Sequence, residues 1–185
     1  MSISRRQFLN TSATTGALLV PATVAGQSSS VQKSQPQLVL SSSGRRLWVL
    51  EILITMKLDS RMTAGAYSSY EDIVLPGRGV PLHVHTREDE TIYVLEGNLR
   101  ITIGDKTYAA QAGDFANMPR NLPHKFQNTG SKPARMLLSF TPGGFEQVFL
   151  EVGKPVTDTH EPPPITPADI KKTKDVAARY GAKWI

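Results

Sequence analysis

From Arg46 onward the chain reads as a long series of short β-type runs separated by turn-forming residues. The runs are predicted at 47–58, 66–75, 82–85, 90–95, 99–103, 106–110, 115–118, 124–127 and 135–141. Glycine, proline, asparagine and aspartate lie between them, and the pair Gly104-Asp105 is typical of a two-residue hairpin turn. Many short strands at regular spacing indicate an all-β fold, which is either a sandwich or a barrel.

The composition excludes several classes of protein. The chain has 185 residues, a length that suits one domain with a substantial core. It has no cysteine, which excludes a disulfide framework and thiolate metal ligands. No apolar run is long enough for an ordinary membrane-spanning helix. The formal net charge of +5 is scattered along the chain without a basic stripe, so we expect no nucleic-acid partner.

Residues 1–26 have the order basic, apolar, small that is typical of an export signal. Arg5 and Arg6 are followed by Phe8 and Leu9, and an uncharged run then ends in small residues that offer cleavage sites. This segment resembles a twin-arginine signal, which implies that the twin-arginine export machinery delivers the folded protein to the periplasm or the outside. After its removal we expect no membrane attachment. A basic terminus with a short helix, and an uncleaved signal that anchors the protein, stay open as alternatives.

The segments on either side of the β-rich region differ from it in composition. Residues 27–45 are rich in serine and glutamine and are predicted to be a flexible spacer before a β-domain at 46–153. Residues 154–185 begin with a proline-rich stretch, in which His160 is expected to face solvent. A helix is predicted to follow, with Thr166 as its N-cap and Pro167 at its first position, and to end near Tyr180.

Two C-terminal helices are therefore expected, because an apolar stripe at helical spacing precedes Gly153. The last helix is predicted to cover an edge or a mouth of the β-domain rather than to carry chemistry. The residues expected to form these apolar faces are Phe145, Val148, Phe149 and Val152 in the first helix, and Ile170, Val176, Ala177 and Tyr180 in the second.

Three of the four histidines fall into one pattern with a glutamate. Side chains two residues apart in a strand point to the same face, so His83 and His85 are able to hold one ion together. A polar turn follows and returns the chain so that Glu90 lies opposite them. Pro123 keeps the chain extended before His124, which would close the site from another strand. Imidazoles with one carboxylate suit a divalent transition metal: Fe, Mn, Ni, Co, Cu or Zn.

The complete spacing consists of two blocks. In the first block, five residues separate Gly77 from His83-Val84-His85, and Glu90 and Gly97 follow. In the second block, Gly113 is followed by Pro119-Arg120-Asn121, His124 and Asn128. These blocks resemble the two motifs of the cupin superfamily, and more narrowly the small type-2 cupins that are quercetin-dioxygenase-like. The resemblance implies a cupin double-stranded β-helix, or jelly-roll barrel, with short C-terminal helices. One departure is Asn121, where the second motif normally has glycine.

The resemblance also implies a site and a function. The metal ligands would be His83, His85, Glu90 and His124, and Glu90 would also take the substrate proton as the catalytic base. The leading interpretation is a metal-dependent dioxygenase for a small aromatic or enolic substrate. A metal-dependent isomerase or decarboxylase, and a non-catalytic module that binds a metal or a small ligand, stay open because function depends on the pocket and not on the fold.

Further expectations concern the surroundings of this site. Phe126 has the same strand parity as His124, so it is a candidate for the wall of the substrate pocket. Glu88 and Asp89 are interpreted as a solvated acidic edge beside the ligands. Cupins often pair through their sheets or exchange terminal strands, so a homodimer is possible, and the long strand predicted at 47–58 is the segment that would be exchanged.

Overall fold

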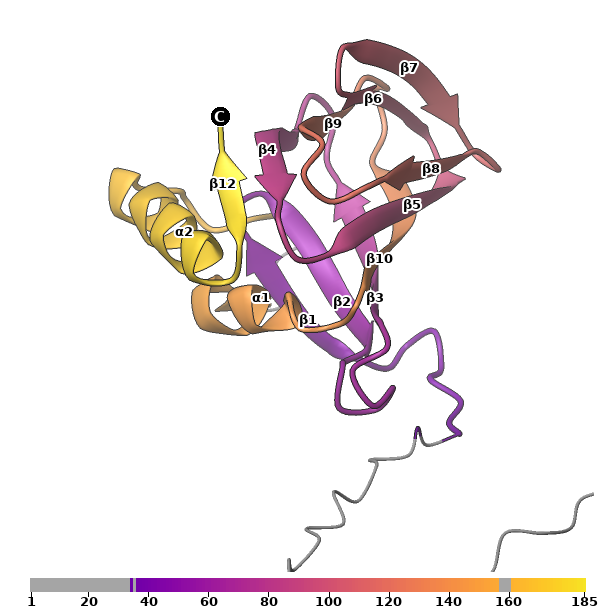
Figure 1. Ribbon diagram of the computed structural model, residues 1–185. Coiled ribbons are helices and arrows are strands. Elements are labelled where there is room, and N and C mark those ends of the chain that lie inside the picture. Colours follow the sequence, from indigo (N-terminus) through magenta and orange to yellow (C-terminus); the bar gives the residue numbers. More distant parts are fainter. Residues whose placement is uncertain (1–33, 35, 157–160) are drawn as a thin grey trace, which may run out of the picture. The chain divides into compact units, whose positions relative to one another are not determined.

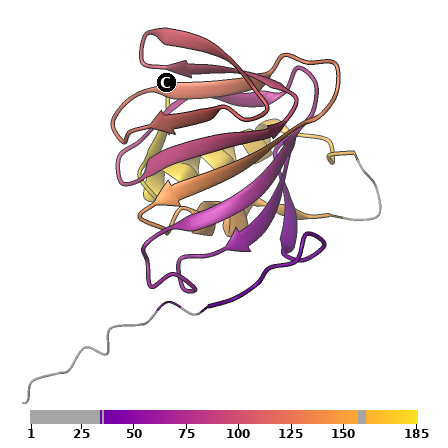
Figure 2. The same ribbon diagram turned by 90° about the vertical axis from the view of Figure 1, so that its right-hand side faces the viewer.

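The computed structural model describes residue 34, residues 36–156 and residues 161–185. The predicted signal at 1–26 and His160 lie outside these described residues. Two antiparallel β-sheets face each other across an apolar core, and two helices cover one side of the barrel (Figure 1, Figure 2). The all-β jelly-roll prediction is therefore confirmed. No helix within the described ranges is both long and apolar enough to cross a bilayer.

The larger sheet has seven strands in the order β11-β1-β2-β3-β10-β5-β8. Its first and last members are short, and its central strands β3, β10 and β5 pair along their whole length. The bounds are β1 Arg45–Val49, β2 Ile52–Leu58, β3 Ser68–Val74, β5 Asp89–Glu96, β8 Phe115–Met118, β10 Ala134–Thr141 and β11 Lys154–Pro155.

The smaller sheet has five strands in the order β12-β4-β9-β6-β7. It contains the predicted hairpin at Gly104-Asp105, which joins β6 to β7 with Ile103 opposite Lys106. The bounds are β4 Gly79–His85, β6 Asn98–Ile103, β7 Lys106–Gln111, β9 His124–Asn128 and β12 Ala182–Trp184.

The core lies between the sheets because inward and outward side chains alternate along each strand. In β10 the side chains of Met136, Leu138 and Phe140 are buried, whereas Arg135 and Leu137, at alternate positions, face outward. The three buried side chains form one apolar face of this strand. Burying each of these large side chains contributes about 1.5–3 kcal/mol of transfer free energy.

The single strand predicted at 47–58 is wrong, because the chain turns back at Leu50-Glu51. Leu50 has a φ of 53°, in the left-handed region, and this turn separates β1 from β2. The two strands then pair with each other from Val49 opposite Ile52 to Arg45 opposite Met56. The pattern misled because both arms of the hairpin are apolar and the turn contains neither glycine nor proline.

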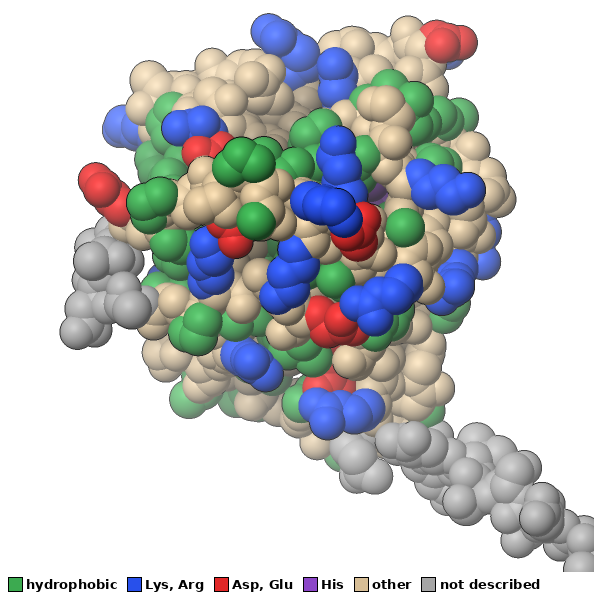
Figure 3. All heavy atoms as spheres, turned by 90° about the vertical axis from the view of Figure 1, so that its left-hand side faces the viewer, with side chains coloured by type: hydrophobic (Ala, Val, Ile, Leu, Met, Phe, Trp, Pro, Cys, Tyr) green, Lys and Arg blue, Asp and Glu red, His purple; other side chains and the backbone are tan. Residues whose placement is uncertain are grey.

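The C-terminal region contains two helices, α1 Glu146–Val152 and α2 Pro167–Arg179. The predicted start of α2 is confirmed: the Thr166 side chain accepts a hydrogen bond from the Asp169 amide, and Asp169 reciprocates, which forms a capping box. Val176 and Ala177 are buried as predicted, whereas Ile170 is 39% exposed. Figure 3 shows the face that carries α2, where basic, acidic and apolar side chains are interspersed.

The C-terminal strand β12 was not predicted. After α2, the chain reverses at Gly181 and forms β12, which pairs with the histidine-bearing strand β4. Ala182 lies opposite His85, and Trp184 lies opposite His83. The C-terminus is therefore an edge strand of the smaller sheet, directly beside two of the predicted site residues.

Candidate metal centre

The smaller sheet supplies three histidines to one place. His83 and His85 lie on β4 with their rings on the same face, 5.0 Å apart between centroids. β9 is the next strand, and its first residue, His124, is the register partner of His83. The rings of His83 and His124 are 4.4 Å apart between centroids. Side chains alternate between the two faces of β4, and β9 pairs directly with β4. These two features are therefore enough to bring the three imidazoles together.

The larger sheet supplies the carboxylate from the opposite wall. Glu90 lies on β5, and its Oε2 atom is 3.2 Å from His124 Nε2, 3.3 Å from His85 Nε2 and 3.8 Å from His83 Nε2. All four side chains are buried, and one ligand atom from each lies within 4.8 Å of the others. The structure thus brings together all four residues that the sequence pattern singled out.

Backbone carbonyls orient two of the imidazoles. His83 Nδ1 lies 2.9 Å from the carbonyl oxygen of Pro81, and His124 Nδ1 lies 2.8 Å from that of Leu122. A carbonyl only accepts, so each Nδ1 carries the proton and donates it. The free Nε2 lone pair of each ring then faces Glu90, which is the tautomer that a metal ligand needs.

Glu88 departs from the prediction of a solvated edge, because it is only 5% exposed. Its Oε2 atom lies 3.7 Å from His85 Nδ1, and neither atom has a hydrogen-bond partner among the described residues. Burial lowers the pKa of His85, but the carboxylates of Glu88 and Glu90 outweigh this effect and raise it to about 9. Glu88 shares strand parity with Glu90, and this was the signal that could have predicted its inward direction.

Asp89 lies on the outside, as predicted. It accepts hydrogen bonds of 2.9 Å from the backbone amide and from Nε of Arg120, and Arg120 also donates to the carbonyl oxygen of Thr141. The next residue, Asn121, has a φ of 65°, and its amide donates to the carbonyl oxygen of His85 at 2.7 Å. Asparagine therefore adopts the left-handed turn that glycine normally provides in this motif.

Glu90 is ionised although it is buried. Burial alone raises the pKa of Glu90, but its contacts with His124, His83 and His85 prevail and hold the pKa well below its usual range. Glu90 is therefore an ionised carboxylate in the interior, with three imidazole nitrogens directed at it. Such a buried charge needs a cation or a set of donors for compensation.

The geometry fits a divalent transition metal. Ligands bound at about 2.1 Å at right angles to each other are roughly 3 Å apart, and the separations of 3.2, 3.3 and 3.8 Å from Glu90 Oε2 are close to this. Each residue offers one nitrogen or oxygen atom, and imidazole and carboxylate are the ligands that Fe, Mn, Co, Ni, Cu and Zn accept. The four side chains could therefore hold one such ion.

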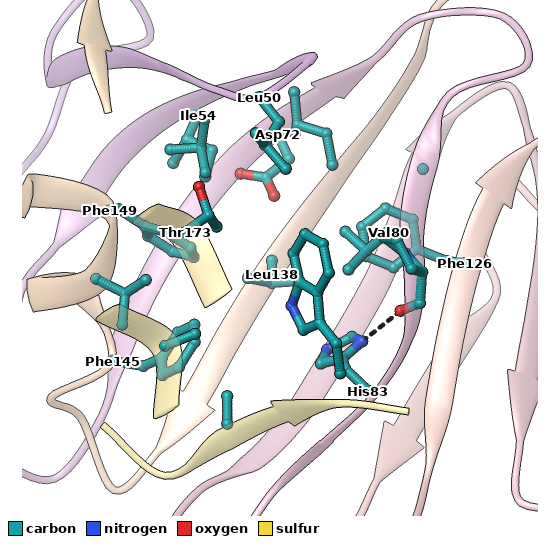
Figure 4. Close-up of a pocket in the computed structure, with 18 of the residues that line it drawn as sticks. Leu50, Ile54, Asp72, Val80, His83, Phe126, Leu138, Phe145, Phe149 and Thr173 are labelled. Carbon is teal, nitrogen blue, oxygen red and sulfur yellow. Dashed lines mark hydrogen bonds between the residues drawn. The ribbon is translucent and has the colours of Figure 1, made fainter. Parts of the chain in front are cut away.

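A cavity of about 270 Å³ opens at this cluster, between the two sheets and the C-terminal helices. His83, His85 and Glu90 lie in its wall, and Phe126 lines it as the sequence suggested. Figure 4 shows the cavity, with the His83 ring held by its hydrogen bond. The other lining residues are mostly apolar, including Ile54, Val80, Leu138, Phe145, Phe149 and Trp184. Such a space suits a small, largely apolar ligand.

Comparison with known sequences finds a family model that matches the segment containing the site. Residues 71–140, which contain all four cluster residues, match the model of the cupin domain. Quercetin 2,3-dioxygenase from Bacillus subtilis (strain 168) is 29% identical over 137 residues, which cover 71% of this chain and 39% of that protein. A polyketide synthase CurC from Streptomyces cyaneus is 30% identical over 83 residues, which cover 44% of this chain and 54% of that protein. The chain thus spans about half the length, or less, of these relatives.

Comparison with solved structures gives the same fold. The structure of KdgF from Halomonas sp. matches with a TM-score of 0.55 at 14% identity, covering 61% of this chain and 99% of that one. At this identity the likeness concerns the fold alone. The two-sheet fold and the cupin-domain match over residues 71–140, the segment that carries the histidine and glutamate cluster, both support a cupin domain in this chain.

Proposed function

We propose that the protein is an exported, metal-dependent dioxygenase that acts on a small aromatic or enolic substrate. The observation that carries the proposal is the buried cluster of three histidines and one glutamate, of which His83, His85 and Glu90 line an apolar cavity. The relative named quercetin 2,3-dioxygenase supports the reaction class, since its similarity extends over 71% of this chain.

In this function, His83, His85, His124 and Glu90 would hold one divalent ion. When bound, such an ion supplies a Lewis acid and, for Fe, Mn, Ni or Cu, redox chemistry with dioxygen. Both atoms of dioxygen enter the product, so no external reductant is required.

The chain itself contributes orientation, proton transfer and exclusion of water. The contacts of Glu90 with the imidazoles use Oε2, so Oε1 is the oxygen that accepts the proton of an enol or phenol. Phe126 and the other apolar lining residues hold the substrate ring and keep water from the reacting atoms.

The test combines metal analysis with oxygen consumption. Natively exported protein is expected to contain about one transition-metal ion per chain by elemental mass spectrometry, and to consume oxygen when flavonols or catechols are added. His124→Ala should lose both the metal and the activity. Lys125→Ala is the matched control, since Lys125 is the next residue on β9 and faces outward.

The possible outcomes separate the proposed function from its alternatives. Zinc in the native protein, or oxygen consumption that is equal in the two variants, would contradict a dioxygenase. Turnover of a keto acid without oxygen would indicate an isomerase or decarboxylase instead, and tight binding without turnover would indicate a binding module.

Export is a separate part of the proposal and rests on the Arg5-Arg6 motif. Replacing both arginines by lysine keeps the charge but removes the paired guanidinium groups. The variant is expected to accumulate in the cytoplasm, whereas the same replacement at Arg45 and Arg46 should leave export unchanged. Equal export of both variants would refute the twin-arginine route.

A further inference from the structure

A second polar group faces the cavity, apart from the metal cluster. Asp72 lies on β3, where it is the register partner of Ile54 on β2 and of Met136 on β10. It is 2% exposed and lines the cavity. In Figure 4, Asp72 lies on the side of the cavity that holds Leu50 and Ile54, and His83 lies on the other side. The cavity is thus lined by buried carboxyl groups at two separate places, Glu90 in the histidine cluster and Asp72.

One carboxyl oxygen of Asp72 is left without a hydrogen-bond partner among the described residues. Its Oδ1 atom is buried and accepts no hydrogen bond from any described residue. On the same face of β3, the neighbours Tyr70 and Val74 are fully buried core residues. An unpaired polar group in such surroundings costs about 1–3 kcal/mol, so an apolar residue would stabilise the fold better. A polar side chain that is buried among apolar residues without a hydrogen-bond partner is typical of a functional site.

The surroundings also determine the chemical form of this side chain. Burial, and then the charges of Glu90 and Glu71, raise the pKa of Asp72 well above its usual value. Glu71 itself points outward and pairs with Arg135 at 2.8 Å. A carboxylic acid that keeps its proton is able to donate one hydrogen bond and to accept another. Asp72 is therefore suited to a neutral oxygen and not to a cation.

We propose that Asp72 recognises the substrate: its carboxyl group binds a carbonyl or hydroxyl oxygen of a small aromatic ligand whose other end faces the histidine cluster. The inference rests on the proposed function only in that the ligand occupies the cavity at the metal centre. It adds a specificity element, since a ligand without this oxygen would leave the buried carboxyl group unpaired.

The test uses three probes of similar size, ethylbenzene, 4-ethylphenol and acetophenone, and protein treated with a chelator. Without the ion, the probes report on the cavity alone. The dissociation constants are measured by calorimetry for the wild type, Asp72→Val and Asp72→Asn. Asp72→Val is expected to bind acetophenone and 4-ethylphenol about tenfold more weakly than the wild type, with ethylbenzene unchanged or tighter. Asp72→Asn should retain most of the preference, because an amide also donates and accepts.

Two controls separate recognition from shape and folding. Leu138→Val changes the same cavity without touching a polar group, and it should shift all three dissociation constants by a similar factor. Asp72→Val is expected to unfold at a temperature equal to or above that of the wild type, which a structural role for Asp72 would not allow. Asp72→Ala repeats the comparison if valine is not accommodated.

The outcomes distinguish this inference from the proposed function. Equal weakening of all three probes in Asp72→Val, or no binding of any probe to the wild type at millimolar concentration, would overturn the role of Asp72. A third outcome is that the metal-loaded protein consumes no dioxygen while the wild type still binds acetophenone and 4-ethylphenol more tightly than Asp72→Val does. In that case the dioxygenase proposal fails and the recognition role of Asp72 stands.

Discussion

Gly181 holds the C-terminal strand β12 against β4, the strand that carries His83 and His85. Its replacement by alanine gives a sharp test of this arrangement. Its φ is 90°, and a Cβ atom there would lie 2.8 Å from Thr86 Oγ1 and 2.9 Å from Arg87 Cγ. The Gly181 carbonyl oxygen accepts hydrogen bonds from the amide and the hydroxyl of Thr86, at 2.9 and 2.8 Å. Any shift that relieves the contact therefore also weakens these bonds.

The magnitude follows from two terms. A left-handed backbone costs an L-residue about 1–2 kcal/mol, and loosening the two hydrogen bonds adds about 1 kcal/mol each. Gly181→Ala is therefore expected to lower the free energy of unfolding by roughly 3–4 kcal/mol. Gly113→Ala is the matched control, because its φ is 95° and nothing lies within 4 Å of the added Cβ. Gly113→Ala should lower the free energy of unfolding only by the cost of the left-handed backbone, about 1–2 kcal/mol.

Urea denaturation measures both costs, and native-state hydrogen exchange shows where the loss occurs. The Ile185 amide donates to the carbonyl oxygen of Leu82 at 3.0 Å, so it reports on detachment of β12. In Gly181→Ala, exchange at Thr86 and Ile185 should accelerate about tenfold for each 1.4 kcal/mol lost, and in Gly113→Ala it should not. Equal costs in the two variants, or unchanged exchange at both amides, would refute the reasoning.

Three further outcomes are expected. A metal ion at about one hundred times its dissociation constant should stabilise the wild type by about 2.7 kcal/mol, a rise of roughly 5–10 °C in Tm by calorimetry, and His124→Ala should show no rise. Phe140→Ala should cost about 3–5 kcal/mol in urea denaturation, since this ring contacts those of Tyr70, His85, Phe145 and Phe149; a smaller loss would mean that the cluster repacks. Hydrogen bonds with Thr166 and an ion pair with Lys154 lower the pKa of Asp169 to about 2. The ionised Asp169 therefore stabilises the fold above pH 3.8, and this contribution is lost as the pH falls toward 2. Asp169→Asn should be destabilising at pH 6, and a difference from the wild type that persists at pH 2 would contradict this.

Much of the candidate site was readable because it depends on short-range geometry. The two-residue periodicity of a strand puts His83 and His85 on one face whatever the rest of the chain does. Glu90 follows a short turn, which returns the chain in the opposite sheet so that the carboxylate faces the histidines. The N-cap at Thr166 and the turn at Gly104-Asp105 are equally local, and the structure contains both where the sequence predicts them.

The features that the sequence did not reveal depend on which segments meet across the barrel. Burial of Glu88, the position of β12 beside β4, and the exposure of Asp72 to the cavity all arise from pairings between residues far apart in the chain. The hairpin at Leu50 lacked turn residues, so only the packing of both its arms in one sheet determined it. By itself, therefore, the sequence determined most of the strands and the four candidate ligands, because these follow from local periodicity. Only the tertiary structure decided what surrounds the ligands, because burial and the shape of a cavity are properties of the packed sheets.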